Sequence, residues 1–243
     1  MLSLISTPIG NLDDISLRAI DVIKSADFIY TEDTRSFKKI LDSIECKKKC
    51  KSFHEHNEDI ICKEIIKHLK NKKHVVLTCE AGTPAISDPG YKLIRECLNL
   101  NLKYTLIPGP SSLINAVVLS GLPTDKFSFY GFIPKKNNAQ QKLFQKVSND
   151  EKTAIMFESV KRLRKTIISI SKHLNKNRHI SVCREMTKIH EQIVQGNCED
   201  LLKKIDDGSL PLKGEIVLVI EGNITNNILS LIHISEPTRQ KPI

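Results

Sequence analysis

Short apolar runs alternate with amphipathic stretches along the first half of the chain. A short apolar run that ends in a turn predicts a buried strand. We therefore expect strands at residues 2–6, 28–31, 75–78, 104–107 and 126–133. Apolar residues spaced three or four apart predict helices between these strands. We place the helices after a cap at Asp13 or Asp14, from segment 32–35 to Leu41, from Asn57 to Leu69, from Gly90 to Leu98, and over 111–120.

This order of strands and helices predicts an α/β fold with a mainly parallel sheet and helices on both of its faces. The second half gives strands at 153–157, 179–183, 191–195 and 215–221, with helices at 160–174 and 199–206. The two strands at 179–183 and 191–195 follow each other closely, which indicates a hairpin and a mixed α/β second domain. A polar, basic stretch at 134–141 separates the halves, so we expect domains at 1–133 and 134–223.

The last twenty residues, 224–243, form a tail after the second domain. Its segment 229–243, LSLIHISEPTRQKPI, continues neither periodicity and resembles the conceptual translation of a sequencing adapter. We therefore expect it to be non-native and exclude it from the fold, with a natural tail as the alternative.

The chain has 243 residues and a formal net charge of +9. A basic chain fits an anionic partner such as nucleic acid, but lysines on solvated helix faces give the same charge. The chain has no run of about 18 apolar residues, so we expect no membrane span. Its start reaches Pro8 and Gly10 without a basic region and reads as a first strand, which predicts a cytoplasmic location.

The seven cysteines form no paired framework, and without an export signal we expect reduced thiols. One cluster, Cys46, Cys50, His54 and His56, has metal-ligand residue types close together. Its spacing does not match common zinc modules, so we expect no metal site.

Three segments rich in Gly and Pro, at 7–11, 81–90 and 108–112, follow predicted strands. Ligands of open α/β sheets bind beyond the carboxyl ends of the strands. Glycine lets a backbone approach a ligand closely, and proline holds the loop shape. The segments therefore indicate a nucleotide-like ligand, with ordinary turns as the alternative for any one loop. The dinucleotide-binding glycine fingerprint, the P-loop and the nucleophile elbow do not occur in the sequence.

Motifs around these loops resemble the ribosomal RNA small subunit methyltransferase I family, a branch of the tetrapyrrole methylases. The first are STPIGNL at 6–12, EDTR at 32–35 and FHEHNE at 53–58. The others follow in order: AGTP at 81–84, DPG at 88–90, PGPS at 108–111, GLP at 121–123, YGFIP at 130–134, FES at 157–159, REMTK at 184–188 and KGE at 213–215. The resemblance covers residues 2–223. The family's usual Ser-Asp before AGTP is replaced by Cys79 and Glu80.

The resemblance implies a two-domain tetrapyrrole-methylase-like fold with S-adenosyl-L-methionine in the cleft between the domains. It also implies a homodimer that 2′-O-methylates a cytidine ribose in the decoding region of small-subunit ribosomal RNA, free or in the assembled subunit. One alternative is a methyltransferase of the same fold that acts on a small molecule such as a tetrapyrrole precursor. The other is a non-catalytic RNA-binding protein.

The expected site has a cofactor side and an acceptor side. For the cofactor we expect Pro8, Gly10, Ala81, Gly82, Thr83, Pro84, Ile86, Asp88, Pro108, Gly109, Pro110, Ser111, Phe157, Thr187 and Gly214. For catalysis at the acceptor we expect Asn11, Asp33, Arg35, His54 and Glu58.

On the acceptor side, Arg35 suits a bidentate phosphate contact. Asp33, Glu58 or His54 suits the ribose hydroxyl, which is a poor nucleophile at neutral pH. A helix cap with an ion pair is the alternative for 32–35. Several basic residues are candidates for RNA phosphates, with solvated helix faces as the alternative. They are Lys135, Lys136, Lys142, Lys161, Arg162, Arg164 and Lys165.

Overall fold

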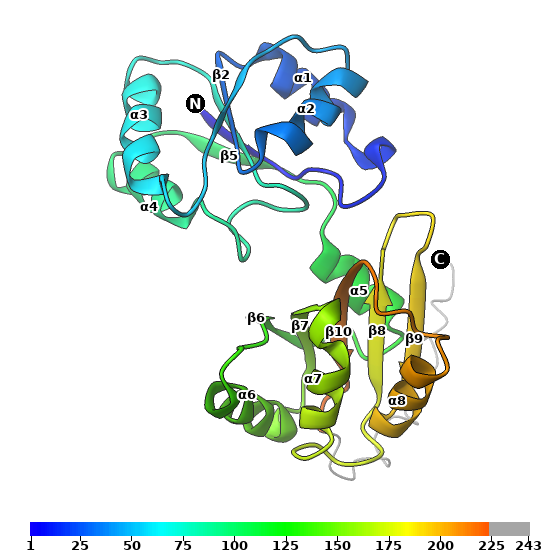
Figure 1. Cartoon of the computed structure of the whole chain (residues 1–243). Coiled ribbons are helices and arrows are strands. Elements are labelled where there is room, and N and C mark those ends of the chain that lie inside the picture. The colour runs from blue at the N-terminus through cyan, green and yellow to red at the C-terminus, as the bar shows by residue number, and fades with distance from the viewer. Residues whose placement is uncertain (224–243) are drawn as a thin grey trace, which may run out of the picture.

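The computed structural model describes residues 1–223, so the expectation for 229–243 lies outside the described residues. Two five-stranded sheets form the framework, one above the other in Figure 1. The first sheet has the order β3-β2-β4-β1-β5, and all of its neighbouring strands are parallel, as predicted. Its strands are β1 (Leu2–Ile5), β2 (Phe28–Thr31), β3 (Cys50–Ser52), β4 (Val75–Thr78) and β5 (Tyr104–Ile107).

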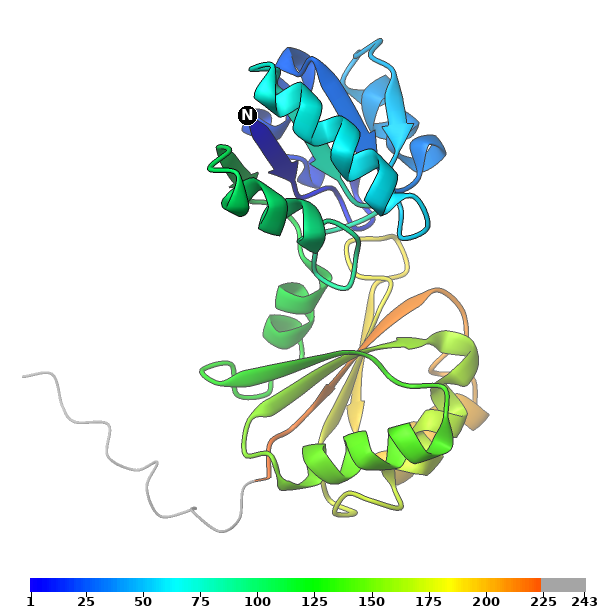
Figure 2. The same cartoon turned by 90° about the vertical axis from the view of Figure 1, so that its left-hand side faces the viewer.

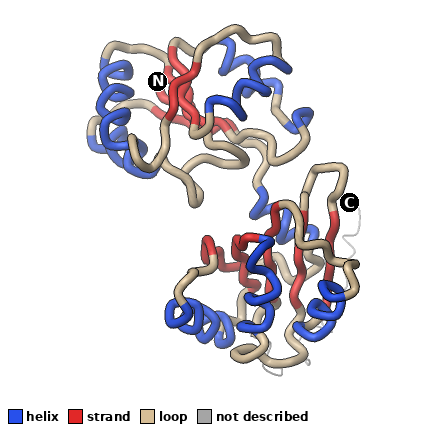
Figure 3. Tube along the Cα trace, viewed as in Figure 1, coloured by secondary structure: helices blue, strands red, loops and turns tan. Residues whose placement is uncertain are grey.

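Successive side chains of the first sheet point to opposite faces. Leu2 and Leu4 pack toward α3 (Glu58–Lys70) and α4 (Tyr91–Asn99). Ile5 packs toward α1 (Leu17–Ser25) and α2 (Thr34–Ser43) on the other face. Both faces are therefore covered by helices, as the near-continuous apolar strands require. Figure 3 shows these helices outside the strands of the sheet.

The second sheet has the order β6-β7-β10-β8-β9 and is mixed. Its strands are β6 (Phe127–Phe132), β7 (Thr153–Ser159), β8 (Ile180–Arg184), β9 (Gln192–Gly196) and β10 (Glu215–Ile220). Only β6 and β7 pair in parallel, while β7–β10, β10–β8 and β8–β9 are antiparallel, which confirms the predicted hairpin.

Helices cover the second sheet unequally. One face carries α6 (Asn137–Asn149), α7 (Leu163–Ile170) and α8 (Cys198–Asp206), through side chains such as Phe144, Ile167 and Leu201. A 3-10 turn, η2 (Val160–Arg162), precedes α7. The other face carries α5 (Ser112–Leu119), whose Ala116 and Val117 pack on β7, β8 and β10. Each helix within residues 1–223 is too short or too polar to cross a bilayer.

The change from one sheet to the other occurs earlier than the expected boundary at residue 134. Both α5 and β6 lie with the second sheet, so the chain crosses over in residues 108–111, after β5. The polar stretch at 134–141 is instead the approach to α6 and its first turns. It resembles a linker because α6 buries only Phe144 and Val147.

Two local expectations were wrong. Helix α1 is capped by Ser16, whose side chain accepts from the Ala19 amide, while Asp13 and Asp14 belong to a 3-10 turn, η1 (Leu12–Asp14). Strand β3 was not predicted because its three residues include no apolar run. It exists through its pairing with β2 at the edge of the sheet.

Candidate functional site

The three Gly/Pro loops meet at the carboxyl ends of β4, β1 and β5, which are neighbours in the first sheet. Thr7 and Gly82 exchange two backbone hydrogen bonds of 2.8 and 3.0 Å. The hydroxyls of Ser6 and Thr83 lie 3.1 Å apart, and Thr83 Oγ1 donates to the Pro110 carbonyl at 3.4 Å. The three loops are therefore bonded into one unit, which makes them a single binding surface.

The first of these loops contacts the second domain at the turn between β8 and β9. A Cβ added to Gly10 would lie 2.5 Å from Lys188 Cγ and 2.7 Å from Thr187 Oγ1, so only glycine fits. Next to it, the Asn11 amide donates to Thr187 Oγ1 at 3.1 Å. Figure 2 shows this turn, in yellow, reaching the loops of the first domain.

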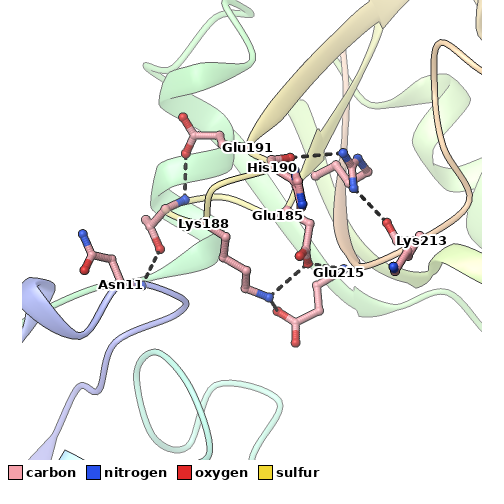
Figure 4. Close-up of polar contacts among 9 residues, drawn as sticks. Asn11, Glu185, Lys188, His190, Glu191, Lys213 and Glu215 are labelled. Atoms are coloured by element: carbon pink, nitrogen blue, oxygen red, sulfur yellow. Dashed lines mark hydrogen bonds and ion pairs between the residues drawn. The ribbon is translucent and has the colours of Figure 1, made fainter. Parts of the chain in front are cut away.

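The β8–β9 turn is held by ion pairs and hydrogen bonds (Figure 4). Lys188 Nζ lies 3.0 Å from both Glu185 Oε1 and Glu215 Oε2, and Glu185 also accepts from the Glu215 amide. The Thr187 amide donates to Glu191 Oε2 at 2.7 Å. These contacts support positive backbone φ angles at Glu185 and Thr187, which L-residues rarely adopt.

A cavity of about 1030 Å³ lies between the two domains, where the fold prediction placed the cleft. The first domain lines it with the three loops, and the second domain lines it with the ends of β7 and β10. Ten residues of the expected cofactor side line this cavity: Pro8, Gly10, Ala81, Gly82, Thr83, Ile86, Asp88, Ser111, Phe157 and Gly214.

The other five expected cofactor residues do not line the cavity, although each belongs to a segment that contributes lining residues. They are Pro84, Pro108, Gly109, Pro110 and Thr187. Two of them make hydrogen bonds that hold the loops. The Pro110 carbonyl accepts from Thr83 Oγ1, and Thr187 Oγ1 accepts from the Asn11 amide. They shape the loops around the cavity.

None of the five expected catalytic residues lines the cavity, and Glu58 has a different role. Glu58 is only 7% exposed, and its Oε1 accepts from the Gly90 amide at 2.9 Å. Its Oε2 lies 3.8 Å from Lys92 Nζ. Gly90 is the N-cap of α4 and ends the loop 81–90, so Glu58 ties α3 to that loop. The geometry assigns it to positioning the loop rather than to the acceptor.

Asp33 and Arg35 form the helix start that was the alternative for this motif. Asp33 caps α2 by accepting from the Arg35 and Ser36 amides at 2.7 and 3.4 Å. These bonds, the Arg35 amide first, hold the pKa of Asp33 below its usual value. The Arg35 side chain is 92% exposed and its guanidinium reaches Asp33 only at 3.5 Å. Arg35 therefore remains open to an external anion.

His54 and its neighbours form a tight turn before α3. The His54 amide donates to Asn57 Oδ1 at 2.9 Å, and Asn57 Nδ2 donates to the Ser52 carbonyl. Asn57 is the N-cap residue of α3, but its side chain binds the turn and does not bond to a helix amide. His54 Nδ1 is buried and has no hydrogen-bond partner within residues 1–223.

The cysteine–histidine cluster is dispersed in the structure. Cys46 and Cys50 pack against the apolar cluster under α1 and α2, and all seven cysteines are unpaired thiols. In the part of the chain that the structure describes, no three His, Cys, Asp or Glu side chains are placed to hold a metal ion.

Five carboxylates line the cavity, and three of them, Glu32, Glu80 and Asp88, come from the first domain. Glu158 and Glu215 come from the second domain, and the expected site included only Asp88. Burial, and then the charge of Glu32, raises the pKa of Asp88 to about 6. Burial is also the main reason that the pKa of Glu32 is raised, and the Glu80 carboxylate adds to it. A signal was present in the sequence, because Glu32 is the first residue after β2 and Glu80 the second after β4, at the ligand edge of the sheet.

The cavity therefore combines loop backbone, apolar walls and negative charge. Its size suits a nucleotide-like ligand, since ligand pockets span about 300–1,000 Å³. Carboxylates crowded in a partly buried cavity favour a ligand that carries positive charge close to them.

The shifted pKa of Asp88 predicts a pH-dependent gain in stability for Asp88→Asn. Because the folded pKa lies above the ordinary value of 3.8, the wild-type carboxyl adds stability at low pH, and this stability is lost as pH rises through about 6. The melting temperature of the unliganded variant should thus exceed that of the wild type at about pH 7.5, but not at about pH 4. Differential scanning calorimetry at both pH values measures this, and an equal difference at both would contradict it.

Comparisons with known proteins agree with this architecture. The family model described as "Tetrapyrrole (Corrin/Porphyrin) Methylases" matches residues 1–202. Among solved structures, the uroporphyrin-III-C-methyltransferase from Thermus thermophilus is similar with a TM-score of 0.62. The similarity covers 90% of this chain and 93% of that chain at 12% sequence identity, so it bears on the fold alone.

Curated relatives are similar over most of the chain. The ribosomal RNA small subunit methyltransferase I of Rickettsia prowazekii (strain Madrid E) is 42% identical over 223 residues, which cover 92% of this chain and 79% of that protein. The protein of the same name from Thermotoga maritima is 38% identical over 221 residues, covering 91% and 98%. The chain therefore belongs to the tetrapyrrole methylases and, within them, to the ribosomal RNA small subunit methyltransferase I family.

Proposed function

We propose that this chain is an S-adenosyl-L-methionine-dependent methyltransferase that methylates the 2′-hydroxyl of a cytidine ribose in the decoding region of small-subunit ribosomal RNA. The observation that carries the proposal is the interdomain cavity, built from the three bonded loops and lined by carboxylates, three of them in the first domain. Membership of a family whose relatives are named ribosomal RNA small subunit methyltransferases supports the RNA acceptor.

The residues of the cavity fit S-adenosyl-L-methionine. The sulfonium and the amino group are cationic, and Glu32, Glu80 and Asp88 offer them negative charge. Apolar side chains such as Ile9 and Phe157 suit the adenine ring and the methylene groups. The cofactor side that we propose is thus the set of ten cavity-lining residues, supported by the five that shape the loops.

The sulfonium supplies a methyl group that is already activated for in-line displacement. The protein's part is then mainly to position the acceptor, which can contribute a large share of the acceleration. The three carboxylates hold a cationic ligand more tightly than a neutral one. The demethylated product, which has lost the sulfonium charge, therefore leaves the cavity more readily than the cofactor does.

We assign the acceptor side to Arg35, His54 and Asn11, with Asp33 and Glu58 as positioning residues. Arg35 is exposed and can hold a backbone phosphate. His54 has an unpartnered ring nitrogen among the described residues and lies near enough to lower the pKa of Glu32. It is our candidate to orient the ribose hydroxyl. Asn11 lies at the contact between the domains, at the rim of the cavity.

The proposed function predicts that a labelled methyl group is transferred from S-adenosyl-L-methionine to small-subunit RNA. Small subunits that lack the modification should accept a labelled methyl group, and nuclease digestion should release it as 2′-O-methylcytidine. A tetrapyrrole precursor assayed in parallel tests the small-molecule alternative. Label found only in the small molecule, or in neither acceptor, would overturn the proposal.

A further prediction uses Arg35→Ala and Lys161→Ala to test whether RNA binding can be weakened without a change in cofactor binding. Arg35 reaches Asp33 only at 3.5 Å, and Lys161 has no ion pair within residues 1–223. The Arg164 guanidinium, by contrast, is occupied by the Asp206 carboxylate at 3.0 and 3.2 Å. Each variant should weaken RNA binding by roughly tenfold and reduce its salt dependence by about one phosphate contact.

Arg164→Ala is the matched control and should bind RNA as the wild type does. Cofactor affinity, measured by calorimetry, should stay unchanged in all three variants. Loss of cofactor binding in Arg35→Ala would show that Arg35 belongs to the cofactor side.

We also propose that the chain forms a homodimer through β5 and α5. Strand β5 is an unpaired edge of the first sheet, and its Tyr104 and Leu106 are exposed. Helix α5 follows directly and exposes Ile114 and Val118 on the side away from its own sheet. Edge strands and large apolar surfaces are usually covered.

Val118→Lys should convert the dimer to a monomer in sedimentation velocity, because it places a charge in the proposed interface. Ile60→Lys, at an exposed apolar position on α3, is the control and should leave the dimer intact. A monomeric wild type at micromolar concentration would contradict the proposal.

Action on ribosomal RNA also favours a cytoplasmic location, which stays a prediction.

A further inference from the structure

Phe132 is an exposed aromatic side chain inside the functional cavity. It is 65% exposed and lines the cavity from the end of β6. A large apolar ring left open in a cleft, instead of being buried in the adjacent core, indicates a binding partner. Phe132 is not among the residues expected for the cofactor, so the cofactor side does not account for it.

The backbone of β6 aims this ring into the cavity. The register between β6 and β7 shifts between Phe129 and Phe132, and Gly131 has a φ of +68°. Such irregularities redirect side chains next to active sites, and the positive φ favours glycine. The position of a Gly131 Cβ is 3.8 Å from Ser87 Oγ, which places this segment against the loop of the first domain.

Neighbouring rings fix the orientation of Phe132. Its centroid lies 5.3 Å from that of Phe157, with 62° between the planes, and Phe157 lies 4.9 Å from Phe129 in a similar T-shaped arrangement. The aromatic ladder thus runs from the sheet to the cavity wall. Phe132 is its last member and keeps most of its surface open for a flat ligand.

A cationic side chain lies in the same wall. Lys161, in the 3-10 turn after β7, also lines the cavity. A ring on which a base can stack and a cation for the backbone phosphate are the two elements that bind an unpaired nucleotide. A nucleotide whose ribose is to be modified has to leave its helix to enter such a cavity, and its base then needs a surface.

We propose that Phe132 is the platform on which the base of the target nucleotide stacks, with Lys161 beside the adjoining phosphate. This inference rests on the proposed RNA acceptor and names a residue that recognises it. It makes Phe132 a substrate-binding residue and leaves the cofactor to the ten cavity-lining residues assigned to it above.

The test compares Phe132→Ala, Phe132→Leu and Phe132→Trp in steady-state methylation of small subunits lacking the modification. Stacking on one ring corresponds to a loss of about 5- to 150-fold in apparent affinity. Phe132→Ala should raise KM for the subunit by that factor while calorimetry finds unchanged cofactor affinity. Phe132→Leu should behave like the alanine variant because it lacks a flat face, and Phe132→Trp should restore wild-type KM.

Tyr91→Ala is the matched control, since Tyr91 is 66% exposed on α4 and does not line the cavity. It should leave both constants unchanged. Weaker cofactor binding in Phe132→Ala would assign the ring to the cofactor's adenine and overturn the proposal. Wild-type KM in Phe132→Ala, or full rescue by leucine, would overturn it as well. If the wild type itself transfers no label to RNA, the proposed function fails, and this inference fails with it.

Discussion

The bonding of the three Gly/Pro loops to one another is the constraint on which the site depends. Parallel strands bring the ends of β4, β1 and β5 to one edge, but the loops that follow carry little secondary structure of their own. The Thr7–Gly82 backbone pair, together with the hydroxyls of Ser6 and Thr83, links them. Glu58 holds the far end of the second loop through the Gly90 amide. The cofactor surface is therefore a bonded assembly, and each loop relies on the others for its shape.

The same loops determine how the two domains meet. Gly10 and Asn11 contact Thr187 and Lys188, in a turn that depends on ion pairs around Lys188. Positive φ angles within this turn are sustained only because the surrounding bonds over-determine it. The width of the cavity thus follows from a small number of polar contacts. These contacts explain why the motif REMTK at 184–188, in the second domain, shares a site with STPIGNL at 6–12.

The charge that lines the cavity is opposite in sign to the net charge of the chain. The chain has a net charge of +9, yet five carboxylates line its cavity, three of them in the first domain. A positive exterior attracts an anionic polymer over a distance, while the local negative charge selects a cationic cofactor at short range. Lys161 and the exposed Arg35 offer positive charge on the side we assign to RNA. The two ligands can therefore bind to neighbouring surfaces without competing for the same charges.

The sequence by itself determined the parts of the fold that depend on local burial and chain direction. Strands β2, β4 and β5 have the predicted bounds, because a short run of β-branched, aromatic and other apolar residues between turns favours a strand. The Gly/Pro loops were expected to lie close together because parallel strands end at the same edge of their sheet. Three other features depend on contacts between segments that are far apart in the sequence, and only the tertiary structure revealed them. The pairing with β2 formed β3, Glu58 bonded to an amide 32 residues away, and a register shift in β6 turned Phe132 into the cavity. Alternation along a strand does not reveal a bulge, and a carboxylate's residue type does not reveal its donor, because both are settled only when distant segments come into contact.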